Sequence, residues 1–260
     1  MALEAKRAVP SAATAGKNGH SLISDAKFRQ LYGLALRLHL VARRHKGAGA
    51  LLAAHVAALA GTAADLRDGD ALIVNEIAGM GAALDAELPG SWMRAHNGAA
   101  PMDRVVEAVA GAAGHRMRKS GGVAVIFVRR DGAGPVMDEA VRLADRGKLP
   151  VLFVEEGAGA PESGARAKKQ GSAPGLEMPA IAVDAQDVIA MYRVAHESIA
   201  RAREGSGPTR IVCVDAAAGQ ERQAKFEDAV EHLEHWLAAR GLPAQAWRRE
   251  IAAEAERGGN

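Results

Sequence analysis

Val123-Ala-Val-Ile-Phe-Val128 is an uninterrupted apolar run that lies between Gly121-Gly122 and Arg129-Arg130. Such a run is typical of a strand that is covered on both faces, as in a parallel sheet. A Gly-rich turn and a helical pattern over about residues 136–147 follow it, and Pro150-Val-Leu-Phe-Val154 then predicts a second buried strand. Strand, turn, helix and strand at this spacing predict a right-handed βαβ crossover.

The same alternation of helices and short apolar strands continues on both sides of this unit. Asp25 and Asp184 are predicted to cap two of the helices. Residues 89–101 and 156–178 are rich in Gly and Ala and are predicted to be loops. The other predicted strands span 71–74, 181–183 and 210–214, and the other predicted helices span about 25–45, 49–64, 76–88, 102–118, 186–204, 222–240 and 244–257. The predicted fold class is therefore α/β, with a mainly parallel sheet flanked by helices.

A chain of 260 residues is long enough for one large domain. Residues 1–25 are rich in Ala, Gly, Ser and Lys and lack an apolar core segment, so we expect a flexible tail and no secretory signal. We expect residues 26–260 to form a single α/β domain that includes the C-terminal helices.

Charge and cysteine content limit the partners and the compartment. Lys and Arg number 33 against 31 Asp and Glu, a balance that predicts neither a nucleic-acid nor a membrane partner. The local cluster Arg116, Arg118 and Lys119 is interpreted as the solvated end of a helix. No apolar stretch reaches membrane-spanning length. The single cysteine, Cys213, lies in an apolar run and is predicted to be a buried structural thiol, and its isolation favours a reducing, cytoplasmic location.

The segment after Val128 is the first place to look for a site, because ligands of open parallel sheets bind beyond the carboxyl ends of the strands. There Arg130, Asp131, Gly132 and Gly134 form a turn whose backbone N–H groups can hold a phosphate, and Asp131 can be a Mg²⁺ ligand. An Asp-Gly turn also serves simply to join a strand to a helix. Both interpretations stay open on this segment alone.

Several segments taken in order are similar to one known family. They are Leu66–Asp70, Val123–Val154, Val183-Asp184, Met191-Tyr-Arg193, Gly207-Pro-Thr209 and the stretch from Leu237 to Glu254. Together they resemble the α subunit of thiamine-diphosphate-dependent 2-oxo acid dehydrogenases of the pyruvate dehydrogenase type, over roughly residues 27–257. The resemblance implies a thiamine-diphosphate-binding fold, in which an Asp and an Asn hold the Mg²⁺ that bridges the cofactor diphosphate.

Most of the positions that bind cofactor in this family carry other residues here. Asp131 remains, but Arg130 stands where the family has glycine, and the family's Asn-Asn pair falls on Gly157-Ala158. An Arg and a His of the family fall on Ala78 and Met80. The family's Gly-His-Ser loop becomes Gly219-Gln-Glu221, and only residues 89–101 occupy the place of its glycine-rich active-site segment.

These departures predict a degenerate member of the family. Arg130, Asp131, Gly132 and Gly134 are then a vestigial cofactor site, Asp131 is a vestigial metal ligand, and no catalytic residue and no bound cofactor are expected. The chain would act as a non-catalytic, assembly or regulatory subunit, in a homodimer or a hetero-oligomer with a β-like subunit, through the small-residue helices near 108–113 and 137–144. Two alternatives remain: a working α subunit that uses thiamine diphosphate and Mg²⁺ with a β partner, and a binder of another phosphate compound through residues 129–135.

Overall fold

The computed structural model describes residues 23–45, 48–74, 88, 93–95, 101–129, 135–158, 178–214 and 228–258. Six strands form one sheet in the order β2-β1-β3-β4-β6-β5, and every neighbouring pair is parallel. The strands are β1 (Ala71–Val74), β2 (Met93–Ala95), β3 (Ala124–Arg129), β4 (Val151–Ala158), β5 (Ala180–Asp184) and β6 (Thr209–Val214). The predicted α/β class with a mainly parallel sheet is confirmed.

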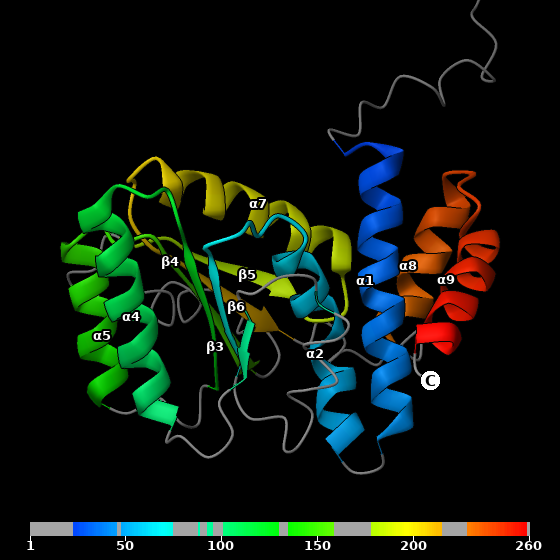
Figure 1. Ribbon diagram of the computed structural model, residues 1–260, viewed down its shortest axis with the longest axis horizontal. Helices are drawn as coiled ribbons and strands as arrows, with labels where there is room; N and C mark the ends of the chain where they lie inside the picture. Colours follow the sequence, from blue (N-terminus) through cyan, green and yellow to red (C-terminus); the bar gives the residue numbers. More distant parts are fainter. Residues whose placement is uncertain are drawn as a thin grey trace, which may run out of the picture.

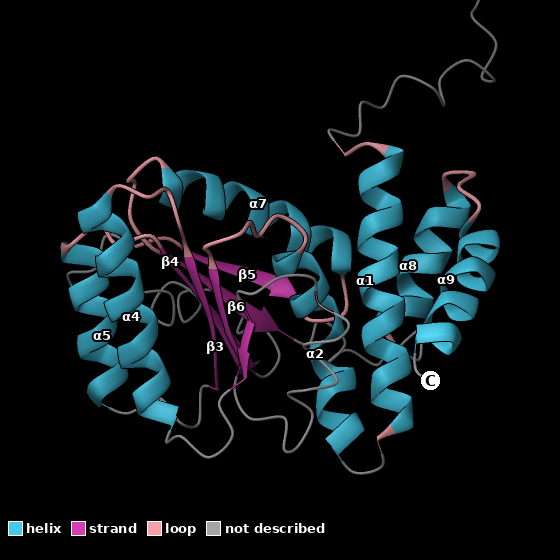
Figure 2. Cartoon of the chain, in the orientation of Figure 1, coloured by secondary structure: helices cyan, strands magenta, loops and turns pink. Residues whose placement is uncertain are grey.

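Helices cover both faces of this sheet (Figures 1 and 2). On one face lie α4 (Pro101–Arg118) and α5 (Pro135–Arg146), which pack on alternate strand residues such as Ile126 and Phe153. On the other face, Phe127 and Val154 enter a larger core that is built mainly from helices. These helices are α1 (Asp25–Arg44), α2 (Ala48–Ala63), α7 (Val188–Arg203), α8 (Ala229–Ala239) and α9 (Ala244–Gly258). Successive side chains of these strands therefore point to opposite faces of the sheet and contribute to two separate hydrophobic layers.

The C-terminal helices α8 and α9 pack against α1 (Figure 1). The ring of Phe28 lies 5.0 Å from that of Trp236, measured between centroids. Tyr32 donates a 2.5 Å hydrogen bond to Glu234, which also accepts a 2.7 Å bond from Arg248. Burial raises the pKa of Tyr32, and the hydrogen bond to Glu234 raises it further. The phenol therefore stays protonated and joins the first described helix to the last two.

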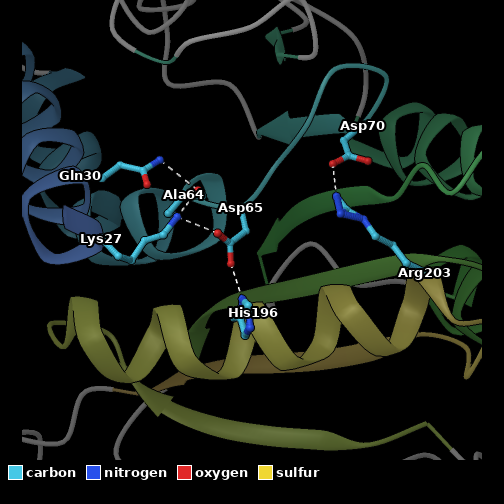
Figure 3. Close-up of polar contacts among 7 residues, drawn as sticks. All are labelled: Lys27, Gln30, Ala64, Asp65, Asp70, His196 and Arg203. Atoms are coloured by element: carbon cyan, nitrogen blue, oxygen red, sulfur yellow. Dashed lines mark hydrogen bonds and ion pairs between the residues drawn. The ribbon is translucent and has the colours of Figure 1, made fainter. Parts of the chain in front are cut away.

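A second set of polar contacts holds the end of α2 (Figure 3). Asp65 lies just after that helix, and its carboxylate accepts a 2.8 Å hydrogen bond from Lys27 of α1 and another from His196 of α7. Burial opposes ionisation of Asp65, but these bonds outweigh it and lower the carboxyl pKa. Gln30 and Lys27 also donate to the Ala64 carbonyl, each over 3.1 Å, so an orphan carbonyl at the helix end is satisfied.

Several predicted boundaries differ from the structure. The N-cap of α1 is Ser24, whose side chain accepts from the Lys27 N–H, so Asp25 is the first helical residue. The N-cap of α7 is Asp187, which accepts from two backbone N–H groups of the first turn, while Asp184 makes only a turn bond to the Gln186 N–H. In both cases two capping residues lie within three positions, and local preference does not separate them.

Three further predictions about loops and helices differ from the structure. The predicted loop at 89–101 contains β2, which pairs with β1 at the edge of the sheet. The predicted loop at 156–178 starts too early, because β4 continues to Ala158 along β6. The helix predicted from residue 222 begins at Ala229, where Asp228 accepts hydrogen bonds from the Val230 and Glu231 N–H groups. The helix predicted at 76–88 lies almost wholly outside the described residues.

Candidate functional site

The carboxyl ends of all six strands meet at one edge of the sheet, because all the pairings are parallel. The predicted site residues Arg130, Asp131, Gly132 and Gly134 belong to the connection between the last residue of β3 and the first residue of α5. That connection lies outside the described residues, as do Ala78, Met80 and 219–221. The vestigial cofactor and metal roles therefore stay predictions, and the donors that can be tested are those on the strands themselves.

Gly157 and Ala158 are the last two residues of β4. Ala158 pairs with Val214 of β6, and the register between these strands shifts between Glu155 and Ala158. Residues 157–158 thus lie at the carboxyl edge of the sheet. Neither residue type has a side-chain oxygen, so this strand end supplies no side-chain ligand to a metal ion.

Glu156, one position earlier, contacts Nδ1 of His55 of α2 through its carboxylate, and the two form an ion pair when the imidazole is protonated. Both side chains are largely buried, with 8% of Glu156 and 19% of His55 exposed. A carboxylate in such a place needs a partner, because an unpaired buried charge costs several kcal/mol by order of magnitude. Sequence reasoning missed this pair: His55 lies in an Ala- and Leu-rich helix, and the only signal was a charged residue at the end of an apolar strand.

The neighbouring Glu155 points to the opposite face of β4 and is also paired. Its Oε2 lies 3.4 Å from Arg210 Nε of β6, and both side chains are mostly buried. Cys213 lies on β6 beneath α2 and α7. Burial raises the pKa of the Cys213 thiol to about 12, and the nearby carboxylates Glu156 and Glu155 add to the effect. A protonated, buried thiol is a poor nucleophile, so the prediction of a structural cysteine is confirmed.

The described donors at this edge do not fit Mg²⁺ and a diphosphate. Mg²⁺ requires a near-octahedral set of oxygen atoms. Glu155 and Glu156 are occupied by Arg210 and His55, and Asp184 is turned to the Gln186 N–H. Within the described ranges no group of three or more His, Cys, Asp and Glu side chains could hold a metal ion.

A pocket of about 430 Å³ lies at the opposite, amino edge of the sheet. Beside it Asp70, which precedes β1, accepts hydrogen bonds from the Arg67 and Val123 N–H groups over 2.8 and 2.9 Å. Asp70 also forms an ion pair with Arg203 at the end of α7 (Figure 3). The carboxylate is buried and satisfied on both oxygens, so it fixes the pocket wall rather than offering a free ligand.

Comparisons with known proteins cover mainly the strand-rich part of the chain. A family model described as "Dehydrogenase E1 component" matches residues 89–215, from just before β2 to the end of β6. These residues, just under half of the chain, are therefore similar to the dehydrogenase E1 component family. The resemblance predicted from the sequence is thereby confirmed for this part of the chain.

The matched relatives are longer proteins. The α subunit of acetoin:2,6-dichlorophenolindophenol oxidoreductase of Bacillus subtilis (strain 168) is 35% identical over 116 residues, which are 40% of this chain and 35% of that protein. The chloroplastic pyruvate dehydrogenase E1 component subunit alpha-3 of Oryza sativa subsp. japonica is 35% identical over 81 residues, 29% of this chain and 19% of that protein. The match to this chain thus spans about a third or less of either relative.

Among solved structures, the E1-like chain is similar to one described as a thiamin diphosphate-dependent enzyme isolated from Mycobacterium smegmatis. The TM-score is 0.39 at 17% identity, over 64% of this chain and 31% of that one.

Among the described helices of this E1-like chain, none is long and apolar enough to cross a membrane.

Proposed function

We propose that this chain is a non-catalytic E1 α-like subunit, which keeps the sheet of the family but has lost thiamine diphosphate and Mg²⁺ binding. The observation that carries the proposal is the carboxyl end of β4. There Gly157-Ala158, the positions of the family's Asn pair, offer no ligand oxygen, and the adjacent Glu156 is paired with His55.

The lost contacts are large enough to matter. A diphosphate brings several negative charges that need a metal and cationic partners once they leave water. Each charge-assisted hydrogen bond that is removed costs roughly 1.5–3 kcal/mol. The Asn, Arg and two His replaced in the sequence would together account for most of a micromolar affinity, which is about 8 kcal/mol.

An assembly role is supported by the outer surface of α4 and α5. Val106, Met117 and Leu143 are large apolar side chains that are 55%, 84% and 56% exposed. All three belong to the helices that cover one face of the sheet, and exposed apolar surface marks a protein contact where it forms a continuous patch. Both relatives described above are named as α subunits, so we propose a β-like subunit as the partner.

The test is a calorimetric titration of the full chain with thiamine diphosphate, with and without Mg²⁺. We expect no Mg²⁺-dependent binding at millimolar cofactor, while circular dichroism shows that the chain is folded. Micromolar binding that requires Mg²⁺ and disappears in Asp131→Ala would refute the proposal. It would favour the alternative of a working α subunit, because Asp131 is the one carboxylate of the family motif that the chain retains.

A further inference from the structure

The amino-edge pocket has a lining unlike that of the carboxyl edge. It is formed by the end of α4 and the turn that follows it, by Pro150 before β4, and by the end of α7. The lining residues are His115, Arg116, Lys119, Gly121, Gly122, Pro150, Ala202, Arg203, Glu204 and Gly205. Three cationic side chains therefore border one cavity, against the single carboxylate of Glu204.

The position of these cations follows from the topology. Each crossover helix runs back from the carboxyl edge to the amino edge, so the basic last turns of α4 and α7 meet there. A basic residue in a last turn offsets the negative end of the helix dipole, which explains part of the pattern. The helix dipole does not explain why Lys119, which follows the helix at a φ of 51°, borders the pocket. Nor does it explain why the Arg116 guanidinium lies close to Gly205.

The glycines of the pocket leave room for the cationic side chains. A Cβ on Gly205 would lie 2.6 Å from Arg116 Nη1, and Gly205 also has a φ of +85°. A Cβ on Gly122 would overlap the ring of His115, whose Nδ1 lies 2.8 Å from the Ser120 hydroxyl. A larger residue at either position would displace a lining side chain, so the positions of Arg116 and His115 depend on these two glycines.

The basic side chains of the pocket differ in whether they have a partner within the chain. Arg203 is paired with Asp70, although its buried Nε has no hydrogen-bond acceptor among the described residues. Arg116 and Lys119 make no ion pair with any residue in the described ranges. Burial lowers the pKa of His115, and Arg118 lowers it further, so this ring is neutral near pH 7. Arg116 and Lys119 thus border the cavity without an ion-pair partner in the described ranges, and Glu204 is the one acidic residue in the lining.

We infer that this pocket binds the phosphate group of a small anionic molecule, independently of any metal ion. Its volume is in the range of small-molecule sites. Arg116 supplies a planar, permanently charged group that can hold two phosphate oxygens, and Lys119 supplies a point charge. The C-terminal ends of α4 and α7 each bring about half a unit of negative charge, and Glu204 brings one more, so recognition rests on directed hydrogen bonds from Arg116 and Lys119 rather than on net charge. The site is distinct from the cofactor edge of the family, because it lies at the other end of the strands.

The probe for the experiment is inorganic pyrophosphate, titrated into the full chain by calorimetry with EDTA present. The test variant is the double substitution Arg116→Gln and Lys119→Gln. The matched control is Arg193→Gln with Arg249→Gln, which removes the same charge from two exposed positions that do not line the pocket. We expect saturable binding to the native chain and to the control, and a loss of about tenfold or more in the test variant.

Absence of saturable binding at millimolar pyrophosphate overturns the inference, and so does an equal loss in the test and control variants. The NMR signal of His115, identified by its absence in His115→Gln, gives a readout on the native chain should the double variant fail to fold. A bound anion should raise the pKa of this ring, and an unchanged titration at saturating pyrophosphate refutes the site. The outcome is separable from that of the proposed function, since cofactor binding there requires Mg²⁺ and depends on Asp131.

Discussion

Replacing Asp70 by Asn is expected to destabilise the fold strongly. The Asp70 side chain is 2% exposed and that of its partner Arg203 is 13% exposed. The carboxylate also accepts from the Arg67 N–H in the turn before β1 and from the Val123 N–H before β3. One side chain thus joins the start of the central strands to the end of α7.

The magnitude follows from what the substitution leaves behind. Asparagine has nearly the same shape but no charge, so the Arg203 guanidinium stays largely buried without a counter-ion. Breaking a buried ion pair from one side costs about 3–5 kcal/mol. For a domain of this size, each kcal/mol lowers Tm by roughly 2–4 °C, so a fall of about 6–12 °C is expected even at the lower figure.

Urea unfolding, followed by the fluorescence of the three tryptophans, measures the free energy of unfolding. The second arm is the double variant Asp70→Asn with Arg203→Met, which removes the unpaired charge. It should lose clearly less stability than the sum of the two single variants, because the residues form one interaction. A loss below about 1 kcal/mol in Asp70→Asn, or strict additivity in the double variant, would show that the pair is not a buried unit.

Three further predictions concern other parts of the core. Gly61→Ala should lower the free energy of unfolding by about 1–3 kcal/mol in urea titrations, because the new Cβ would lie 2.7 Å from the Met191 side chain and 2.8 Å from the Tyr192 nitrogen. An unchanged unfolding midpoint would mean that α2 and α7 pack less closely than the structure shows. Cys213 should resist iodoacetamide at pH 8 in the native chain and react once the chain is unfolded, since its pKa is raised to about 12; rapid native labelling contradicts this. Burial lowers the pKa of His39, so the free energy of unfolding should fall as the pH drops below 6.5, where the unfolded chain takes up a proton more readily than the folded chain. In urea titrations from pH 7.5 to 5, His39→Gln should reduce the dependence of this free energy on pH.

The central strands could be predicted from the sequence because their signal is local. A run such as Val123–Val128 is apolar throughout, and only a strand buried on both faces requires this pattern over so few residues. β2 has no such signal. Met93–Ala95 is a strand because Leu72–Val74 lies beside it, and this pairing depends on the tertiary fold rather than on the three residues themselves.

The site could be predicted from the sequence only as a hypothesis. The rule for parallel sheets directs attention to the carboxyl edge, but the residues that it selects, 130–134, lie outside the described ranges, so this prediction stays open. The pair His55–Glu156 joins residues 101 positions apart (156 minus 55), so no local pattern could indicate it. The cluster Arg116, Arg118 and Lys119 was visible in the sequence and does lie at a helix end, but the cavity beside it depends on Gly205, from another crossover.

The two edges of the sheet differ in how their charges are compensated. At the carboxyl edge, Glu155 is paired with Arg210 and Glu156 contacts His55, so both of these described carboxylates already have a partner within the chain. At the amino edge, Asp70 neutralises Arg203 but leaves Arg116 and Lys119 facing an open pocket. Arg116 and Lys119 are exposed, so water screens their charges, and a phosphate can replace this water without breaking an ion pair between described residues. The proposed phosphate site therefore has cationic donors without a partner in the described ranges, whereas the described glutamates at the carboxyl edge already have partners.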